Sequence, residues 1–317
     1  MRNSAVGRRA NPSWLPYLAL GVGVLALGFS AILVSWAAAP GAVTGFYRML
    51  VAVLVLAFPL QRRLRRTGPV PGRELLIACV AGLLFAGDLI FWNSGVLISG
   101  AVNPTLMGNT APVWVALGAW LFFRERLNGL FWAGLALALM GAAAILGQDA
   151  RQGFEVGLGS LFGLVAGIFY GGYFLVTQRS RRALDALTAF WLAAASATLV
   201  CLAAALILRQ PLTGYAMRTY LSFLGLGLLV QVVGQFAFSY ALGYLPATLV
   251  SPAGLGQPVV TALFAAPLLH EKISPLEIVA GTAVLIGVYV VHRSRQIDAA
   301  AAPAGAQMPA EGRYPGT

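Results

Sequence analysis

Thr110-Ala111-Pro112-Val113-Trp114 opens an apolar segment that ends in the charged stretch Phe123-Arg124-Glu125-Arg126. The same pattern returns 146 positions later, where Gln257-Pro258-Val259-Val260 leads to His270-Glu271-Lys272. Of the sixteen positions from Ala111 to Arg126, six are identical in the later copy. An apolar segment that contains proline and ends in a charged turn therefore occurs twice, which indicates an internal duplication.

Two further stretches repeat at nearly the same offset. Val43-Thr44-Gly45-Phe46-Tyr47 corresponds to Leu187-Thr188-Ala189-Phe190-Trp191 at an offset of 144, and Phe91-Trp92-Asn93 corresponds to Ala237-Phe238-Ser239 at 146. The duplication therefore covers most of the chain.

Composition indicates a membrane protein. The 317 residues are 59% hydrophobic and 10% charged, whereas a soluble domain carries about 25% charged residues. The net charge of +11 does not indicate a nucleic-acid partner, because the basic residues lie in short loops between apolar runs. Cys79 and Cys201 lie inside such runs, which argues against a disulfide framework. His270 and His292 are too far apart for a metal-binding motif, and we expect neither a metal nor a cofactor.

Ten apolar runs have about the length of a membrane-spanning helix. They are Leu15–Trp36, Val43–Leu60, Leu75–Leu97, Val102–Phe123, Leu130–Leu146, Val156–Thr177, Leu184–Leu208, Tyr220–Leu242, Thr248–Leu269 and Leu276–Val291. The predicted fold is an all-α integral membrane protein with ten transmembrane helices. Each half holds five helices, an odd number, so the second half enters the membrane from the opposite side and the halves form inverted-topology repeats.

The predicted organisation has four parts. A basic cytoplasmic tail covers residues 1–13, the first repeat covers 14–147, the second covers 156–292, and a disordered cytoplasmic tail covers 293–317. Ala37-Ala38-Ala39 after the first run resembles a signal-peptide cleavage site, which is an alternative interpretation. We favour a retained helix, because the run is long for a signal peptide and has a counterpart in the second half.

The basic residues predict the orientation. With ten crossings both termini lie on one side, and 16 of the 21 Lys and Arg residues then lie on that side, with four opposite and one inside a run. Cytoplasmic loops of membrane proteins carry the excess of Lys and Arg. We therefore expect both termini to be cytoplasmic.

The repeated motifs resemble those of a known family. The Pro-Val pair early in the fourth and ninth runs, and the Arg/His-Glu-Arg/Lys stretch before the fifth and tenth, are similar to the drug/metabolite transporter superfamily. Within it the chain resembles EamA-type permeases, and especially bacterial exporters of aromatic and other amino acids. The resemblance covers about Trp14 to Val291.

The resemblance implies a secondary transporter in the bacterial inner membrane. It would export small metabolites, most of all amino acids including aromatic ones, by alternating access, as a monomer or a homodimer. A uniporter or channel-like permease for nucleosides, sugars or drugs is the alternative. The sequence favours neither a membrane enzyme, since it shows no catalytic motif, nor a sensor, since its tails are short.

Asp88 is the most informative single residue, because a carboxylate in mid-helix costs roughly 2.5–3.5 kcal/mol to insert. It is expected to face the protein interior, either for proton coupling or amine binding, or as a structural partner of Arg48 or a neighbouring amide. Arg48 is predicted to have a structural role or to extend to the membrane surface. If it faced the transport path, it could attract a substrate carboxylate.

Helical spacing gathers polar and aromatic side chains into stripes. Each residue alone is explained by packing or an interhelical hydrogen bond, but the set favours a cavity for a zwitterionic or aromatic metabolite. The predicted substrate-binding residues are Asp88, Trp92, Asn93, Asn103, Met107, Thr110, Tyr170, Tyr173, Gln231, Gln235, Phe238 and Gln257.

Three other features have structural interpretations. The glycine series Gly159, Gly163, Gly167 and Gly171 predicts a close-packing surface. Pro112 and Pro258 predict matched kinks, with or without a hinge function. Glu125 and Glu271 are expected to cap the helices that follow them.

Overall fold

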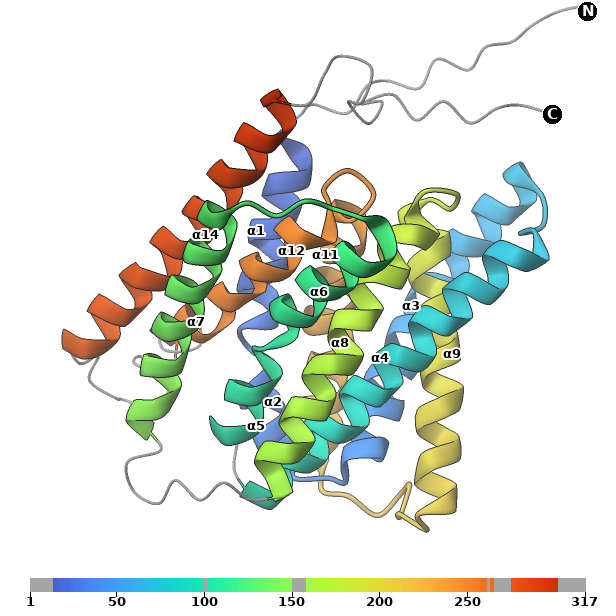
Figure 1. The fold of residues 1–317 in the computed structure, drawn as a ribbon. Coiled ribbons are helices and arrows are strands. Elements are labelled where there is room, and N and C mark those ends of the chain that lie inside the picture. The colour runs from blue at the N-terminus through green and yellow to red at the C-terminus, as the bar shows by residue number, and fades with distance from the viewer. Residues whose placement is uncertain (1–13, 100–101, 150–157, 261–262, 265–274, 302–317) are drawn as a thin grey trace, which may run out of the picture.

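The computed structural model describes residues 14–99, 102–149, 158–260, 263–264 and 275–301 (Figure 1). These residues form helices α1 (Leu15–Leu27), α2 (Ser30–Ala37), α3 (Gly41–Thr67), α4 (Gly72–Ser99), α5 (Val102–Gly108), α6 (Ala111–Phe123), α7 (Gly129–Asp149), α8 (Leu158–Arg181), α9 (Ala186–Ile207), α10 (Met217–Gly225), the π-helix η2 (Leu226–Gln235), α11 (Phe236–Ala241), α12 (Ala247–Ala253), the 3-10 helix η3 (Gly254–Gly256) and α14 (Pro275–Ala301). The described chain contains no strand. The all-α prediction is therefore confirmed for these residues.

Seven described helical stretches are long and apolar enough to cross a membrane. They are Leu15–Ala37, Gly41–Arg65, Gly72–Ile98, Leu158–Arg181, Ala186–Ile207, Met217–Ala241 and Ile278–Ile297. Ala111–Phe123 and Gly129–Ala144 are shorter apolar helices. The chain is thus a multi-pass membrane protein, and the count of ten crossings stays a prediction.

Several predicted helices are interrupted. The first divides at Gly28–Phe29 into α1 and α2, and the fourth divides at Asn109–Thr110 into α5 and α6. The eighth is continuous but changes to π-helical geometry over Leu226–Gln235. At the C-terminus, α14 continues to Ala301, so the helix extends into the segment predicted to be a disordered tail.

The helices pack in a regular set of pairs. Helix α7 lies against α14, α3 against α9, and α4 against both α8 and α9. Helix α1 packs on η2 and α11, and η2 also packs on α3. In Figure 1, α7 and α14 form a layer beside the remaining bundle.

Contacts at the helix ends show that partners in two of these pairs are antiparallel. Arg63 near the end of α3 forms a 2.6 Å ion pair with Asp185 at the start of α9. Ser294 of α14 donates to Asn128, just before α7, at 2.8 Å. The Tyr17 ring lies 5.1 Å from the His292 ring, so the start of α1 and the end of α14 lie at the same end of the bundle (Figure 1).

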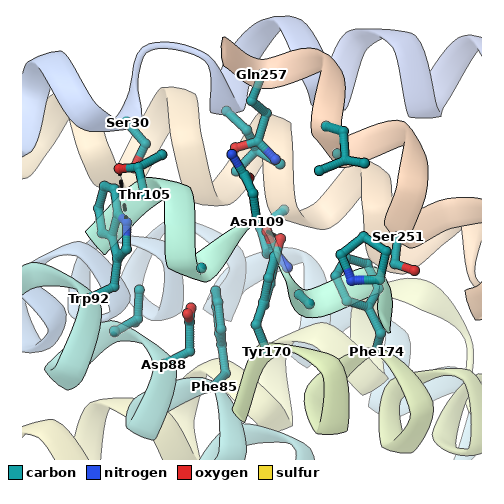
Figure 2. Close-up of a pocket in the computed structure, with 18 of the residues that line it drawn as sticks. Ser30, Phe85, Asp88, Trp92, Thr105, Asn109, Tyr170, Phe174, Ser251 and Gln257 are labelled. Carbon is teal, nitrogen blue, oxygen red and sulfur yellow. Dashed lines mark hydrogen bonds between the residues drawn. The ribbon is translucent and has the colours of Figure 1, made fainter. Parts of the chain in front are cut away.

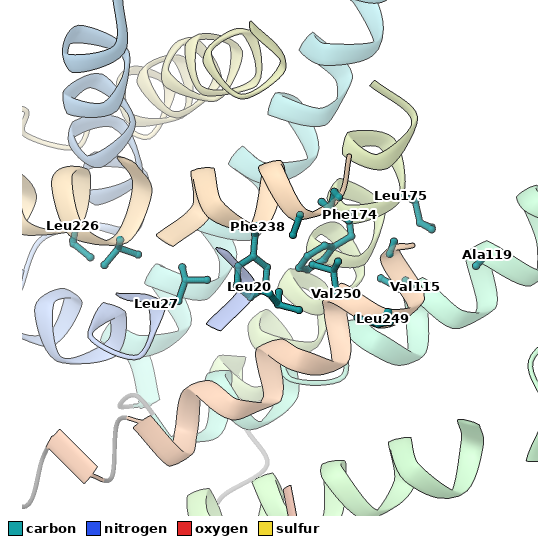
Figure 3. Close-up of a cluster of buried hydrophobic side chains, with 14 of the residues drawn as sticks. Leu20, Leu27, Val115, Ala119, Phe174, Leu175, Leu226, Phe238, Leu249 and Val250 are labelled. Atoms are coloured by element: carbon teal, nitrogen blue, oxygen red, sulfur yellow. The ribbon is translucent and has the colours of Figure 1, made fainter. Parts of the chain in front are cut away.

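The main apolar core lies between the two halves (Figure 3). It includes Leu20 and Leu27 of α1, Val115 of α6, Phe174 of α8 and Phe238 of α11. Within a bilayer such side chains stabilise the fold by close packing between helices rather than by leaving water. The first predicted helix is thus an integral part of the core.

The glycine series on α8 is confirmed as a close-packing surface for α5 and α6. A Cβ atom placed on Gly163 would lie 2.4 Å from the Pro104 carbonyl oxygen, and one on Gly171 would lie 2.8 Å from Trp114 Cβ. Only a hydrogen at these positions allows the broken helix pair to approach α8.

The capping role predicted for Glu125 is wrong. Its Oε2 instead accepts from Arg295 at 2.9 Å and from Thr248 Oγ1 at 3.1 Å. Asn128 caps α7, because its Oδ1 accepts from the Phe131 amide at 2.9 Å. The carboxylate therefore joins the end of α6 to α12 and α14. Glu271 lies outside the described residues.

Asp185 caps α9 and yields a stability prediction. Its Oδ1 accepts from the Leu187 and Thr188 amides at 3.1 and 3.2 Å. Burial raises the Asp185 pKa, but hydrogen bonds from Thr188 and Arg63 outweigh burial and hold the pKa below its usual value. A lowered pKa means that the carboxylate stabilises the fold above the unfolded pKa, about 3.9, and that this contribution is lost as pH falls through the folded pKa.

We expect Asp185→Ala to lower the free energy of unfolding by about 1 kcal/mol at neutral pH, as measured by denaturation in detergent. The difference from wild type should shrink below about pH 4. Arg63→Gln keeps the cap and is the matched control; it should cost less, because a partly exposed ion pair contributes roughly 0–1 kcal/mol. Equal losses in the two variants would contradict a dominant role for the cap.

Candidate functional site

A cavity of about 100 Å³ lies between the two halves of the chain. Its polar lining residues are Ser30, Arg48, Asp88, Thr105, Asn109, Gln235, Ser251 and Gln257. Its aromatic lining residues are Phe85, Trp92, Tyr170 and Phe174, and the remaining lining consists of Leu27, Leu89, Gly108, Ala111, Pro112, Gly254 and Leu255. Both halves contribute charged or polar groups together with apolar surface, as expected for a small-molecule site.

The cavity lies where several helices are interrupted. Leu27 ends α1, Gly108 and Ala111 flank the break between α5 and α6, and Gly254 begins η3. Pro112 lies in the first turn of α6, where proline needs no backbone hydrogen-bond partner. Irregular backbone at membrane depth is tolerated where it lines a cavity, so these breaks distinguish the site from the surrounding packed helices.

Aromatic side chains form one wall. Phe85 of α4 and Tyr170 of α8 stack with ring centroids 6.2 Å apart, and Tyr170 contacts Phe174 at 4.6 Å. On the other side of Asp88, the Trp92 indole donates to Thr105 Oγ1 at 3.3 Å (Figure 2). These flat, rigid surfaces can contact an apolar or aromatic group.

Arg48 lies inside the bundle and is only 2% exposed. Its Nη2 lies 3.5 Å from Ser30 Oγ. In the amide orientation that satisfies both side chains, the Gln231 oxygen accepts from Arg48 Nη2 at 3.1 Å and from Nε at 2.8 Å. The interpretation that Arg48 extends to the membrane surface is therefore wrong, because its guanidinium group is held at the cavity.

Asp88 lies on α4 between Phe85 and Trp92, and its carboxylate points into the cavity (Figure 2). The described residues contain two ion pairs, and neither involves Asp88 or Arg48. The cavity therefore has a cationic and an anionic group that are not within ion-pair distance of each other.

Other polar atoms of the lining also lack partners among the described residues. They are Asn109 Nδ2, Gln235 Nε2, Ser251 Oγ and Arg48 Nη1. Buried polar groups are normally hydrogen-bonded, so these groups are available to a polar ligand or to water. The described residues contain no group of three or more His, Cys, Asp or Glu side chains that could hold a metal ion.

Five of the predicted binding residues line the cavity: Asp88, Trp92, Tyr170, Gln235 and Gln257. The others with described side chains lie elsewhere. Asn93 is buried and donates to the Gly41 carbonyl oxygen at 3.2 Å. Tyr173 stacks behind Phe85, and Phe238 belongs to the apolar core.

The remaining predicted residues have indirect or undescribed positions. Gln231 is fully buried behind Arg48. Thr110 donates to the Met107 carbonyl oxygen at 2.6 Å at the α5–α6 break, and neither residue lines the cavity. Asn103 belongs to α5, but its side chain lies outside the described part of the structure.

In the fourth run, the residues at the cavity differ from those predicted. Thr105 and Asn109 line it, whereas Met107 and Thr110 do not. Ser30, Arg48, Phe85, Phe174 and Ser251 were also absent from the predicted set. Phe85 was detectable, since it precedes Asp88 by three positions and Trp92 by seven and shares their helix face.

Comparisons with known proteins agree on the class of protein. The EamA-like transporter family model matches residues 12–147 and 157–293. The chain is 29% identical over 187 residues to a Salmonella typhimurium protein named "Probable amino-acid metabolite efflux pump", a match that spans 56% of this chain and 62% of that protein. An Escherichia coli protein of the same name gives the same identity and coverage.

A third relative and a solved structure extend the comparison. A Streptantibioticus cattleyicolor protein named "Probable terminal-alkyne amino-acid exporter" is 27% identical over 248 residues, which is 77% of this chain and 80% of that protein. A crystal structure superposes with a TM-score of 0.74 over 89% of this chain and 98% of the other, at 18% identity. That last likeness shows a shared fold.

Proposed function

The chain belongs to the EamA-like transporter family, and we propose that it exports small metabolites, most of all amino acids including aromatic ones, across the bacterial inner membrane by alternating access. The observation that carries this proposal is the cavity between the halves, which combines Arg48, Asp88 and an aromatic wall. An amino acid needs a cationic partner for its carboxylate, an anionic partner for its ammonium group and apolar surface for its side chain. The names of the relatives support the same substrate class.

The packing pattern supports inverted repeats. In the internal repeat, α7 corresponds to α14 and α3 corresponds to α9. Helix α7 packs on α14 and α3 packs on α9, so each helix contacts its own counterpart. The same repeat relates the pair α4–α8 to the pair formed by α1 with η2 and α11, and both pairs are in contact. Halves of opposite orientation that meet at a central site are typical of secondary transporters.

The distribution of arginine supports cytoplasmic termini. Arg62, Arg63 and Arg65 end α3, and Arg179 and Arg182 lie at the end of α8. The start of α1 and the end of α14 lie at one end of the bundle (Figure 1). The Arg63–Asp185 ion pair joins the end of α3 to the loop after α8. An excess of Arg at the end that carries the termini is typical of the cytoplasmic side.

A counterflow screen tests the function. Purified protein in liposomes preloaded with one unlabelled amino acid, nucleoside or sugar should accumulate the labelled form of that solute transiently, and an amino acid should give the largest signal. A carrier shows saturation and counterflow, whereas a channel shows neither. Failure of every amino acid would contradict the preferred substrate class, and linear flux without counterflow would favour the channel-like alternative.

Coupling to protons through Asp88 stays a hypothesis, motivated by a carboxylate inside the cavity. If the Asp88→Asn variant took up substrate with unchanged pH dependence, coupling through this residue would be ruled out. Matched hinges at Pro112 and Pro258 also stay a prediction.

A further inference from the structure

We propose that the cavity holds a zwitterionic amino acid in one orientation, with its carboxylate on Arg48 and its ammonium group on Asp88. This inference rests on the proposed transport of amino acids and adds which residue recognises which end of the substrate. It follows from the contacts of the two charged groups with their neighbours.

The guanidinium group of Arg48 has N–H donors that no described residue accepts from. The amide oxygen of Gln231 occupies Nε and one hydrogen of Nη2, and Ser30 Oγ lies 3.5 Å from Nη2. Nη1 has no hydrogen-bond partner among the described residues. Because a guanidinium nitrogen of this kind carries two hydrogens, both remain for a ligand.

Every hydrogen-bond partner of Arg48 among the described residues is neutral, and Asp88 lies beyond ion-pair distance. A buried charge is costly unless an opposite charge accompanies it, and Arg48 is 2% exposed with only neutral groups in hydrogen-bond contact. A carboxylate is the anionic group that fits a guanidinium donor best, since the hydrogen bond between them is assisted by both charges. Arg48 therefore provides the carboxylate site.

Gln235 extends this donor region. It lies four positions after Gln231 in η2, and its Oε1 accepts from the Tyr170 hydroxyl at 3.3 Å. That contact fixes the amide so that Nε2, which has no partner among the described residues, remains a donor at the cavity. The donors of Arg48 and Gln235 come from the neighbouring helices α3 and η2.

Asp88 provides the negative charge for the ammonium group, and it comes from a different helix. Its carboxylate emerges from α4 between Phe85 and Trp92, and it is in neither of the ion pairs of the described chain (Figure 2). An ammonium group at this point meets a carboxylate and lies beside an indole ring, which attracts cations as well. The side chain of the substrate then lies against the wall formed by Tyr170 and Phe174.

The test measures binding to the purified full-length protein. L-phenylalanine and L-leucine are compared with their amides, which lack the carboxylate, and with 3-phenylpropionate and 4-methylpentanoate, which lack the amino group. Wild type should bind each amino acid about 10- to 100-fold more tightly than either analogue, because each charged hydrogen bond contributes about 1.5–3 kcal/mol. This comparison needs no variant, so it does not depend on the folding of a mutant.

Variants then test which residue binds which charged end of the amino acid. Arg48→Gln should weaken amino-acid binding to the level of the amides and leave binding of the amides unchanged. Asp88→Asn should weaken amino-acid binding to the level of 3-phenylpropionate and 4-methylpentanoate and leave binding of these two acids unchanged. Arg48→Lys, which keeps the charge but not the paired geometry, should lie between Arg48→Gln and wild type.

Three outcomes would overturn the inference. If wild type bound the amino acids and their analogues equally well, the protein would not recognise the charged groups of the substrate. Uniform weakening of all ligands in both variants would indicate that Arg48 and Asp88 stabilise the cavity rather than contact the substrate. Amino-acid binding without discrimination would leave the proposed export intact. Binding of neither amino acid, together with failure of every amino acid in the counterflow screen, would overturn both.

Discussion

Replacement of Gly163 by alanine is expected to lower the free energy of unfolding by about 3 kcal/mol, the upper range for an overpacked helix contact. The new Cβ atom would lie 2.4 Å from the Pro104 carbonyl oxygen and 2.5 Å from Pro104 Cα. These are backbone atoms of α5 and cannot rotate away as the end of a side chain can. Relief of the clash requires α5 to move from α8, and α5 supplies Thr105 and Gly108 to the cavity.

Gly172→Ala is the matched control on the same helix. The nearest neighbour of its Cβ atom would be the Leu84 side chain, at 3.4 Å, an ordinary van der Waals contact. Because alanine is about 1 kcal/mol better than glycine inside a helix, this variant should be neutral or slightly stabilising. Chemical denaturation in detergent and counterflow measure the two effects. Wild-type stability and transport in Gly163→Ala would show that α5 is not held against α8 as described.

Gln231→Leu is expected to destabilise the fold by about 3 kcal/mol, the upper end for loss of a hydrogen bond to a charged group. The leucine side chain cannot accept the hydrogen bonds that Arg48 donates from Nε and Nη2. The guanidinium group would then lose its orientation, and transport should fall with stability.

Gln231→Glu separates these two effects. A carboxylate at this position forms an ion pair with Arg48, so stability should equal or exceed that of wild type. The same ion pair neutralises the proposed carboxylate site, so amino-acid counterflow should fall nonetheless. Thermal unfolding and counterflow on the same preparations provide both values. A variant that kept full transport would show that the charge of Arg48 is not used on the substrate.

Several positions predicted for the site failed where helix geometry departs from a regular α-helix. Gln231, Gln235 and Phe238 were all predicted to bind substrate on the basis of α-helical spacing. The π-helix over Leu226–Gln235 has more residues per turn than an α-helix and therefore changes the direction of the side chains that follow it. Gln235 consequently lines the cavity, while Phe238 lies in the apolar core.

The helix breaks had the same consequence in the first half. Asn109 and Thr110 separate α5 from α6, so regular helical spacing does not continue from Met107 to Thr110. Thr110 bonds within the break, and Thr105 and Asn109 face the cavity instead. Spacing predicts shared faces only along uninterrupted helices.

By itself, the sequence determined the membrane class, the duplication, the family resemblance and the position of Asp88 at the site. These depend on composition, on the recurrence of motifs such as Pro112-Val113 and Pro258-Val259, and on the cost of a charge in a helix, all of which are local properties. Only the tertiary structure decided that Arg48 turns inward to Gln231 and Ser30, and that Glu125 binds Arg295 rather than capping α7. The physical reason is that a polar group inside a membrane takes whichever partner the packing of distant helices brings within reach.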